Sequence, residues 1–242
     1  MTAGTISIAG AGGDEIEAYF AAPAGAGPYG AVVLIHHMPG YDRWSKEVAR
    51  RFAADGYLAL LPNLYSREAP GADPDDAAAL ARKRGGVPDQ RLVGDVGGAA
   101  DHLRRLPTSN GKVAVIGHCS GGRQAVLAGC NLQLQGVVDC YGAFVTGTPP
   151  ADYPLPVTGL EDQLANLSCP VLGMFGVEDS RPSPEDVATL DRLLTEHGVA
   201  HEFHSYDGAG HGFFATDRPS YRQQQAVDGY ARIADFFART IG

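Results

Sequence analysis

Apolar and polar residues alternate along the first part of the chain, which is the pattern of strands that bury one face. The alternation covers Ile6–Ile8 and Glu15–Ala21, and Gly10–Gly13 lies between the two segments. These glycines lack the G-x-G-x-x-G spacing of a phosphate-binding loop, and a second strand rather than a helix follows them. The chain is therefore predicted to begin with an antiparallel hairpin.

Beyond this hairpin, short apolar runs alternate with segments in which apolar residues recur at helical spacing. Continuous apolar runs are typical of parallel strands buried on both faces. Repeated strand–helix alternation predicts an α/β fold with a mostly parallel sheet and helices on both faces. Strands are expected at Ala31–Ile35, Tyr57–Leu61, Val113–Ile116, Gly136–Cys140, Val171–Phe175 and His201–Tyr206. Helices are expected at Trp44–Asp55, Pro74–Arg84, Gln90–Leu106, Gly121–Cys130 and Tyr221–Arg239, and one more is expected to begin at Pro184, directly after the N-cap Ser183. The buried face of the last helix is expected to contain Val227, Tyr230, Ala234 and Phe237.

The chain shows no internal repeat and no linker that would divide it. A length of 242 residues is within reach of one α/β domain, so residues 1–242 are expected to form a single domain. The irregular stretch is Ala143–Leu167, which contains four prolines. A loop of that length in a compact domain is commonly a lid or a binding loop, and this segment is the candidate lid.

Charge and hydropathy exclude two classes of partner. The chain has 28 acidic and 19 basic residues, and a formal net charge of −9. Nucleic-acid binding relies on clustered Lys and Arg, so nucleic acid is not an expected partner. No apolar run approaches the ~18 residues that span a bilayer. The N-terminus also lacks the basic and apolar regions of a secretory signal, so a cytoplasmic protein without a membrane partner is expected.

Four cysteines are present, at positions 119, 130, 140 and 169, without a C-x-x-C pair. In a reducing compartment these residues are expected to be free thiols, three of which fill core volume. No H-x-x-x-H sequence and no Cys/His cluster has the spacing of a zinc site, so no metal is expected.

The remaining cysteine lies in the sequence Gly117-His118-Cys119-Ser120-Gly121, directly between a predicted strand and a predicted helix. This is the setting of the nucleophile elbow G-x-S-x-G, with Cys119 in the place of serine. The helix N-terminus favours the thiolate form of such a cysteine. Ser120 does not fit the elbow position, because residue 118 would then have to be small. The competing interpretation is an ordinary glycine-rich turn beside a buried cysteine.

A carboxylate and a histidine follow in the order nucleophile, acid, base that this kind of site uses. Asp179 lies in the loop after the strand Val171–Phe175, at the end of a strand where sheet enzymes place their sites. His211 lies in the glycine-rich loop after His201–Tyr206. In the predicted triad, His211 takes the thiol proton and Asp179 orients the imidazole. Glu178 is the competing acid.

An oxyanion hole requires two backbone N–H groups near the nucleophile. The amide of Ser120, directly after Cys119, is the first candidate. The second comes from the loop after Ala31–Ile35, where Pro39 has no N–H. The amide of Met38 is therefore expected to be the donor, with His37 as the alternative.

These motifs resemble those of the dienelactone hydrolase (carboxymethylenebutenolidase) family over most of the chain. The similar segments are Gly117–Gly122, Gly56–Tyr65, Arg67–Gly71 and Ala209–Phe213. The resemblance implies an α/β-hydrolase fold, a Cys–His–Asp triad and no cofactor. It further implies a small-molecule substrate, a lactone or an activated ester, that is hydrolysed through a thioester acyl-enzyme.

The sequence departs from the family prototype at two functional positions. His37 occupies the place of a glutamate that helps to activate the thiol, and Ala215 occupies the place of an arginine that holds the substrate carboxylate. Arg218 lies three residues further on. Candidate residues for substrate binding or activation are therefore His37 and Phe213, together with an arginine at position 67, 82 or 84. The missing arginine and the negative net charge argue against dienelactone itself as the substrate.

Two other functions fit the same residues. One is an esterase for neutral or bulkier esters, in which the proline-rich segment shapes the pocket. The other is a non-catalytic or redox protein with Cys119 as a sensor thiol. The sequence leaves a monomer and a weak dimer both open.

Overall fold

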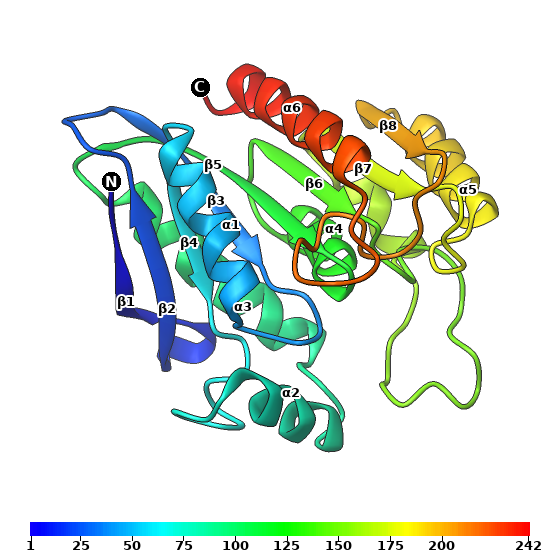
Figure 1. Cartoon of the computed structure of the whole chain (residues 1–242), viewed down its shortest axis with the longest axis horizontal. Coiled ribbons are helices and arrows are strands. Elements are labelled where there is room, and N and C mark those ends of the chain that lie inside the picture. Colours follow the sequence, from blue (N-terminus) through cyan, green and yellow to red (C-terminus); the bar gives the residue numbers. More distant parts are fainter.

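The computed structural model describes residues 1–242 and contains one eight-stranded sheet with the strand order β1-β2-β4-β3-β5-β6-β7-β8 (Figure 1). The first two strands pair antiparallel, and β2 pairs antiparallel with β4. All other neighbours are parallel, which confirms the predicted hairpin and the mostly parallel sheet. The strands are β1 Thr2–Ala9, β2 Glu15–Ala22, β3 Tyr29–Ile35, β4 Leu58–Pro62, β5 Ser109–His118, β6 Gly136–Cys140, β7 Val171–Gly176 and β8 His201–Tyr206.

Helices cover both faces of this sheet, as the alternation of elements predicts. One buried cluster contains residues of α1 and α6, and the other contains residues of α2, α3, α4 and α5. None of these helices is both long and apolar enough to cross a membrane. Their bounds are α1 Arg43–Ala54, α2 Pro74–Lys83, α3 Asp89–Arg104, α4 Ser120–Asn131, α5 Pro184–Glu196 and α6 Gln223–Thr240.

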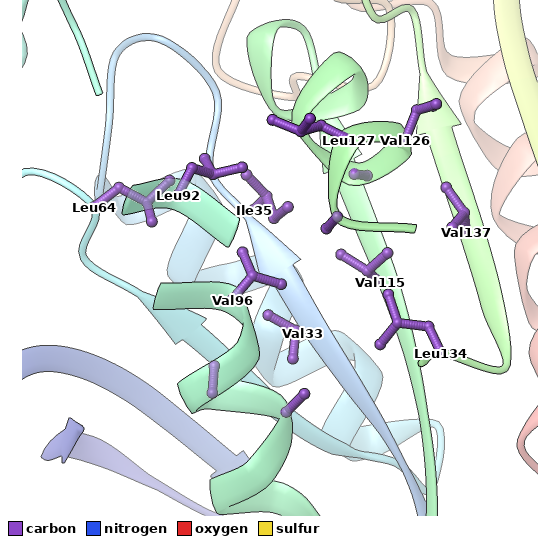
Figure 2. Packing of buried hydrophobic residues seen from close by; sticks show 14 of the residues in the cluster. Val33, Ile35, Leu64, Leu92, Val96, Val115, Val126, Leu127, Leu134 and Val137 are labelled. Atoms are coloured by element: carbon purple, nitrogen blue, oxygen red, sulfur yellow. The ribbon is translucent and has the colours of Figure 1, made fainter. Parts of the chain in front are cut away.

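The central strand β3 shows why the strands are continuous apolar runs. Successive side chains of a strand point to opposite faces. Val33 and Ile35 contribute to the cluster under α3 and α4, where they lie near Val96 and Val115 (Figure 2). The intervening residues of β3 contribute to the cluster under α1 and α6. Both faces of the strand are covered, so no polar position is allowed along it.

The start of α5 is the one that the sequence predicts. The Ser183 hydroxyl accepts the Asp186 N–H at 3.2 Å, and the Asp186 carboxylate accepts the Ser183 N–H at 2.9 Å. This reciprocal pair is a capping box, and it satisfies two backbone donors that the helix leaves unpaired.

The structure corrects two predicted details. Tyr230 and Phe237 of α6 are buried as expected, but Val227 is 61% exposed and Ala234 is also on the solvent side. The helix is rotated relative to the predicted face, and its buried stripe consists of Ala226, Gly229, Tyr230, Ile233, Phe236 and Phe237. The proline-rich segment is also not irregular throughout. Its last part forms the 3₁₀ helix η2, Glu161–Asn166, which is anchored by a buried leucine.

Candidate active site

The turn between β5 and α4 places Cys119 at the N-terminus of α4 with a φ angle of 57°. A positive φ is strained for a side chain other than glycine. The flanking glycines allow this turn, because a Cβ atom at Gly117 would lie 1.8 Å from the carbonyl oxygen of Gly121. A Cβ atom at Gly121 would lie 2.5 Å from the carbonyl oxygen of Ile35. The close packing of three backbone segments therefore requires both glycines.

Gly117→Ala tests this steric requirement. The added methyl group meets backbone atoms that cannot move without opening the turn, so we expect a loss of about 3 kcal/mol or more of unfolding free energy. Urea denaturation followed by circular dichroism measures the loss. Gly4→Ala is the matched control, because nothing lies within 4 Å of a Cβ at that position. Equal stability of the two variants would contradict the steric interpretation of the elbow.

His211 and Asp179 form a hydrogen-bonded pair beside this turn. The His211 Nδ1–H donates to Asp179 Oδ2 at 2.8 Å, and the Asp179 side chain is buried. This bond leaves Nε2 of His211 free for the sulfur of Cys119, which lines the same cavity and interacts with the imidazole. Glu178, the competing acid of the sequence prediction, is exposed, and its carboxylate forms no hydrogen bond or ion pair with His211. The structure thus brings together Cys119, His211 and Asp179.

The electrostatics of this cluster favour a thiolate and an imidazolium. Burial alone raises the pKa of the Cys119 thiol, but the interaction with His211 and the amides of Ser120 and Met38 bring this pKa below its usual value. Burial lowers the pKa of His211, but Asp179 and the Cys119 sulfur raise it to about 10. The two groups stabilise each other's charged form across the pH range between their pKa values.

The pH dependence of alkylation measures this thiolate directly. Thiolate rather than thiol reacts with iodoacetamide, so the rate for Cys119 should fall only when the pH drops through its lowered pKa. We expect an apparent pKa below that of glutathione measured in parallel. His211→Asn removes the stabilising partner and should move the titration to higher pH. A native Cys119 that titrates at or above glutathione would contradict the assignment.

The two amides expected to form an oxyanion hole lie next to the sulfur. Met38 and Ser120 both line the cavity, and their N–H groups stabilise the charged sulfur. The Tyr65 hydroxyl donates to the Met38 carbonyl oxygen at 3.0 Å and so fixes the orientation of this peptide segment. The amide of Met38, and not that of His37, is therefore the one presented to the nucleophile.

A cavity of about 640 Å³ opens above Cys119. Its walls come from the loop after β4, from the segment 84–89, and from the proline-rich segment through Tyr153, Leu155 and Val157. Among the predicted substrate-binding arginines, Arg82 and Arg84 line this cavity, and neither has a carboxylate partner. The cavity wall is thus positive at these two positions even though the whole chain carries a net charge of −9.

Three predicted substrate-binding residues lie away from this cavity. His37 is buried and donates from Nε2 to Asp42 at 2.6 Å, which anchors the start of α1 instead. Arg67 forms a two-pronged ion pair with the buried Asp95, at 2.8 and 2.9 Å. Phe213 is fully buried, with its ring stacked on Phe214. These contacts hold the three side chains in the core, at the start of α1 and at the N-terminal hairpin, outside the set of residues that line the cavity.

Sequence reasoning missed two cavity arginines. Arg123 is buried and holds Asp89 through two bonds of 3.0 and 2.8 Å, and it also donates to the carbonyl of Thr158. It thereby ties α4 to the start of α3 and to the base of the proline-rich segment. Arg181 lies two residues after Asp179 and has no carboxylate partner. The available signals were the four-residue spacing from Cys119 to Arg123 on one helix face, and the shared loop of Asp179 and Arg181.

A parallel sheet with a cysteine on the β5–α4 turn, and a His–Asp pair at the ends of the following strands, defines the class of α/β-hydrolases. The chain belongs to the Dienelactone hydrolase family, which it matches over residues 16–241. It is therefore a hydrolase of lactones or esters that acts on small-molecule substrates.

Individual relatives extend over nearly the whole chain. A Salmonella typhimurium protein provisionally named carboxymethylenebutenolidase is 34% identical, covering 100% of this chain and 89% of its own length. The carboxymethylenebutenolidase of Pseudomonas putida is 31% identical, over 96% of this chain and 95% of its own. A crystal structure from Klebsiella pneumoniae, provisionally named a dienelactone hydrolase, has a TM-score of 0.86 at 30% identity and covers 98% of both chains.

Proposed function

We propose that this protein hydrolyses a lactone or an activated carboxylic ester through a thioester on Cys119. The observation that carries the proposal is the 2.8 Å bond from His211 to the buried Asp179, next to a cysteine whose pKa is lowered. This arrangement supplies a nucleophile, a proton carrier and an orienting carboxylate in one place. It supports ester hydrolysis over a role for Cys119 as a sensor thiol.

In the first step, the sulfur attacks the carbonyl carbon, and the carbonyl oxygen becomes an oxyanion between the amides of Met38 and Ser120. The tetrahedral intermediate then collapses. The C–O bond to the alcohol breaks as the S–C bond is completed, and the leaving oxygen takes the proton of the His211 imidazolium. In a lactone the released alcohol stays attached to the acyl group.

In the second step, water cleaves the thioester. Acylation removes the negative charge of Cys119, which is one of the two groups that raise the pKa of His211. The imidazole is neutral after it has protonated the alcohol, and without the adjacent thiolate it stays unprotonated at lower pH, so it is available to accept a proton from the attacking water. The hydroxide attacks the thioester carbon, the sulfur leaves as thiolate, and the free acid departs. Side chains of this chain handle every proton and electron pair, so the proposal requires no cofactor.

The position of Arg82 bears on the substrate. Its charge acts on the hydroxyl of Tyr65, whose side chain holds the Met38 segment. Arg82 follows β4 and the Met38 loop follows β3, both on one side of β5 in the sheet, whereas His211, which protonates the leaving alcohol, follows β8 on the other side. We propose that the acyl part of the substrate points towards Arg82 and that an anionic acyl group is bound there.

Two esters of phenol test this proposal. Phenyl butyrate is neutral, and monophenyl glutarate carries a carboxylate at the end of its acyl chain. We expect wild-type protein to hydrolyse both and to prefer the glutarate. Arg82→Gln should lower the preference about tenfold, the order of a charge-assisted hydrogen bond. A preference that stays the same in Arg82→Gln would contradict this role, and a wild-type preference for the neutral ester would favour an esterase for neutral substrates.

A further inference from the structure

Arg181 is an unpaired arginine at the edge of the candidate active site. Most arginines of this chain bind a carboxylate or a carbonyl oxygen; they include Arg50, Arg67, Arg91, Arg104, Arg123, Arg192, Arg222, Arg232 and Arg239. Arg181 lines the cavity with its guanidinium 5.9 Å from the centre of the Phe144 ring and no anionic partner. A positive group in that position is free to bind an anion in the cavity.

Asp179 fixes Arg181 beside the proton carrier. One oxygen of the Asp179 carboxylate accepts the His211 Nδ1–H, and the other accepts the backbone N–H of Arg181 at 2.8 Å. The backbone of Arg181 is thus attached to the same group that orients the imidazole. His211 must approach the oxygen of the leaving alcohol to protonate it. The alcohol part of the substrate therefore lies on the side of the cavity where Arg181 is placed.

We propose that Arg181 binds an anionic group, such as a carboxylate, on the alcohol part of the substrate. The inference rests on the ester hydrolysis proposed above and assigns a second anion subsite to the same cavity. Arginine suits this role because its planar guanidinium binds a carboxylate through two parallel hydrogen bonds.

The sheet places this subsite opposite the one assigned to Arg82. Arg82 belongs to α2, which follows β4, and Arg181 follows β7. Three strands, β3, β5 and β6, separate β4 from β7, which at about 4.8 Å per strand puts the two strands about 19 Å apart. Cys119 follows β5, between them. An ester that fills both subsites would therefore carry one negative charge on each side of its scissile carbonyl.

Four esters separate the two subsites. Phenyl butyrate carries no carboxylate, and monophenyl glutarate carries one on its acyl part. 3-Carboxyphenyl butyrate carries one on its alcohol part, and 3-carboxyphenyl hydrogen glutarate carries one on each part. For each protein variant, the ratio of kcat/KM with and without the alcohol carboxylate is measured. We expect Arg181→Gln to lower this ratio about tenfold or more. Arg82→Gln should lower only the ratio for the acyl carboxylate, and the exposed Arg105→Gln, outside the cavity, should change neither.

A binding measurement tests Arg181 independently of turnover. Isothermal titration calorimetry with 3-hydroxybenzoate, the alcohol product, should show binding to wild-type protein and at least tenfold weaker binding to Arg181→Gln, with phenol as the neutral control. Equal binding of 3-hydroxybenzoate to both proteins would overturn the subsite, as would an Arg181→Gln effect confined to the acyl carboxylate. Failure of the ester chemistry itself has a different signature, because Cys119→Ala would then match wild type on phenyl butyrate.

Discussion

Replacing Cys119 with alanine is expected to reduce the hydrolysis of phenyl butyrate by roughly 10⁴-fold while leaving the protein folded. The substitution removes the nucleophile, and loss of the attacking atom of a triad removes nearly all the chemistry that its partners support. Alanine keeps the Cβ atom on which the strained turn is built, and no buried hydrogen bond of the core depends on the sulfur. The measurements are kcat/KM for the ester and the urea midpoint of each protein.

Cys130→Ala is the matched control for this prediction. Cys130 lies on the same helix, α4, but its thiol is buried in the core, where burial raises its pKa to about 12. Its replacement should cost some stability and leave the rate nearly unchanged. Ser120→Ala tests the neighbouring hydroxyl and should also retain activity, because Ser120 contributes its amide. Retention of more than a tenth of the wild-type rate by Cys119→Ala would contradict the assigned nucleophile.

The second large effect is expected for Asp179→Asn, with a loss of roughly 10²- to 10⁴-fold in kcat. Asparagine keeps the shape of the side chain but removes the charge that raises the pKa of His211. The imidazolium then loses its main stabilisation, and the ring can adopt the tautomer that presents a proton away from the substrate. The pKa of Cys119 should rise as well, because its partner is no longer charged at neutral pH.

Glu178→Gln provides the comparison for Asp179→Asn. It removes the same charge one residue earlier, from an exposed side chain, and should change kcat by less than about twofold because solvent screens this carboxylate. Rates and the alkylation titration of Cys119 are measured for both variants. Equal losses in the two variants, or an unchanged titration in Asp179→Asn, would contradict the role of Asp179.

Much of the fold follows from local patterns. The strands β6 and β8 have the predicted bounds. Strand β6 is buried along its whole length, as its mostly apolar run predicts, whereas β8 is an edge strand of the sheet and is only partly buried. The start of α5 follows from Ser183 and Pro184, which set a helix N-terminus through contacts within four residues. The face that α6 buries depends instead on how the helix is rotated against the sheet. The sequence pattern allowed a face containing Val227, which the packing leaves exposed.

The candidate site likewise contains residues that local motifs predict and residues whose positions depend on the packing of distant segments. The positions of Cys119 and His211 follow from short motifs, because the turn and the loop that present them are local structures. Arg67 is a candidate site residue in the sequence because nothing near it in the chain shows its partner. Asp95 lies 28 residues away, and only the packing of the N-terminal hairpin against α3 reveals the ion pair. Arg181 shares the loop of Asp179, but no local pattern shows that its side chain lines the cavity without a carboxylate partner, so it is absent from the residues predicted for the site.

The proposed mechanism requires a covalent acyl group at Cys119. Mixing the protein with monophenyl glutarate, quenching with acid within the first turnovers and mapping the peptides by mass spectrometry tests for it directly. We predict a glutaryl thioester on the peptide that contains Cys119, absent from Cys119→Ala. Steady hydrolysis with no acyl group on Cys119 under conditions that trap a thioester, or an acyl group on another residue such as Ser120, would contradict the account.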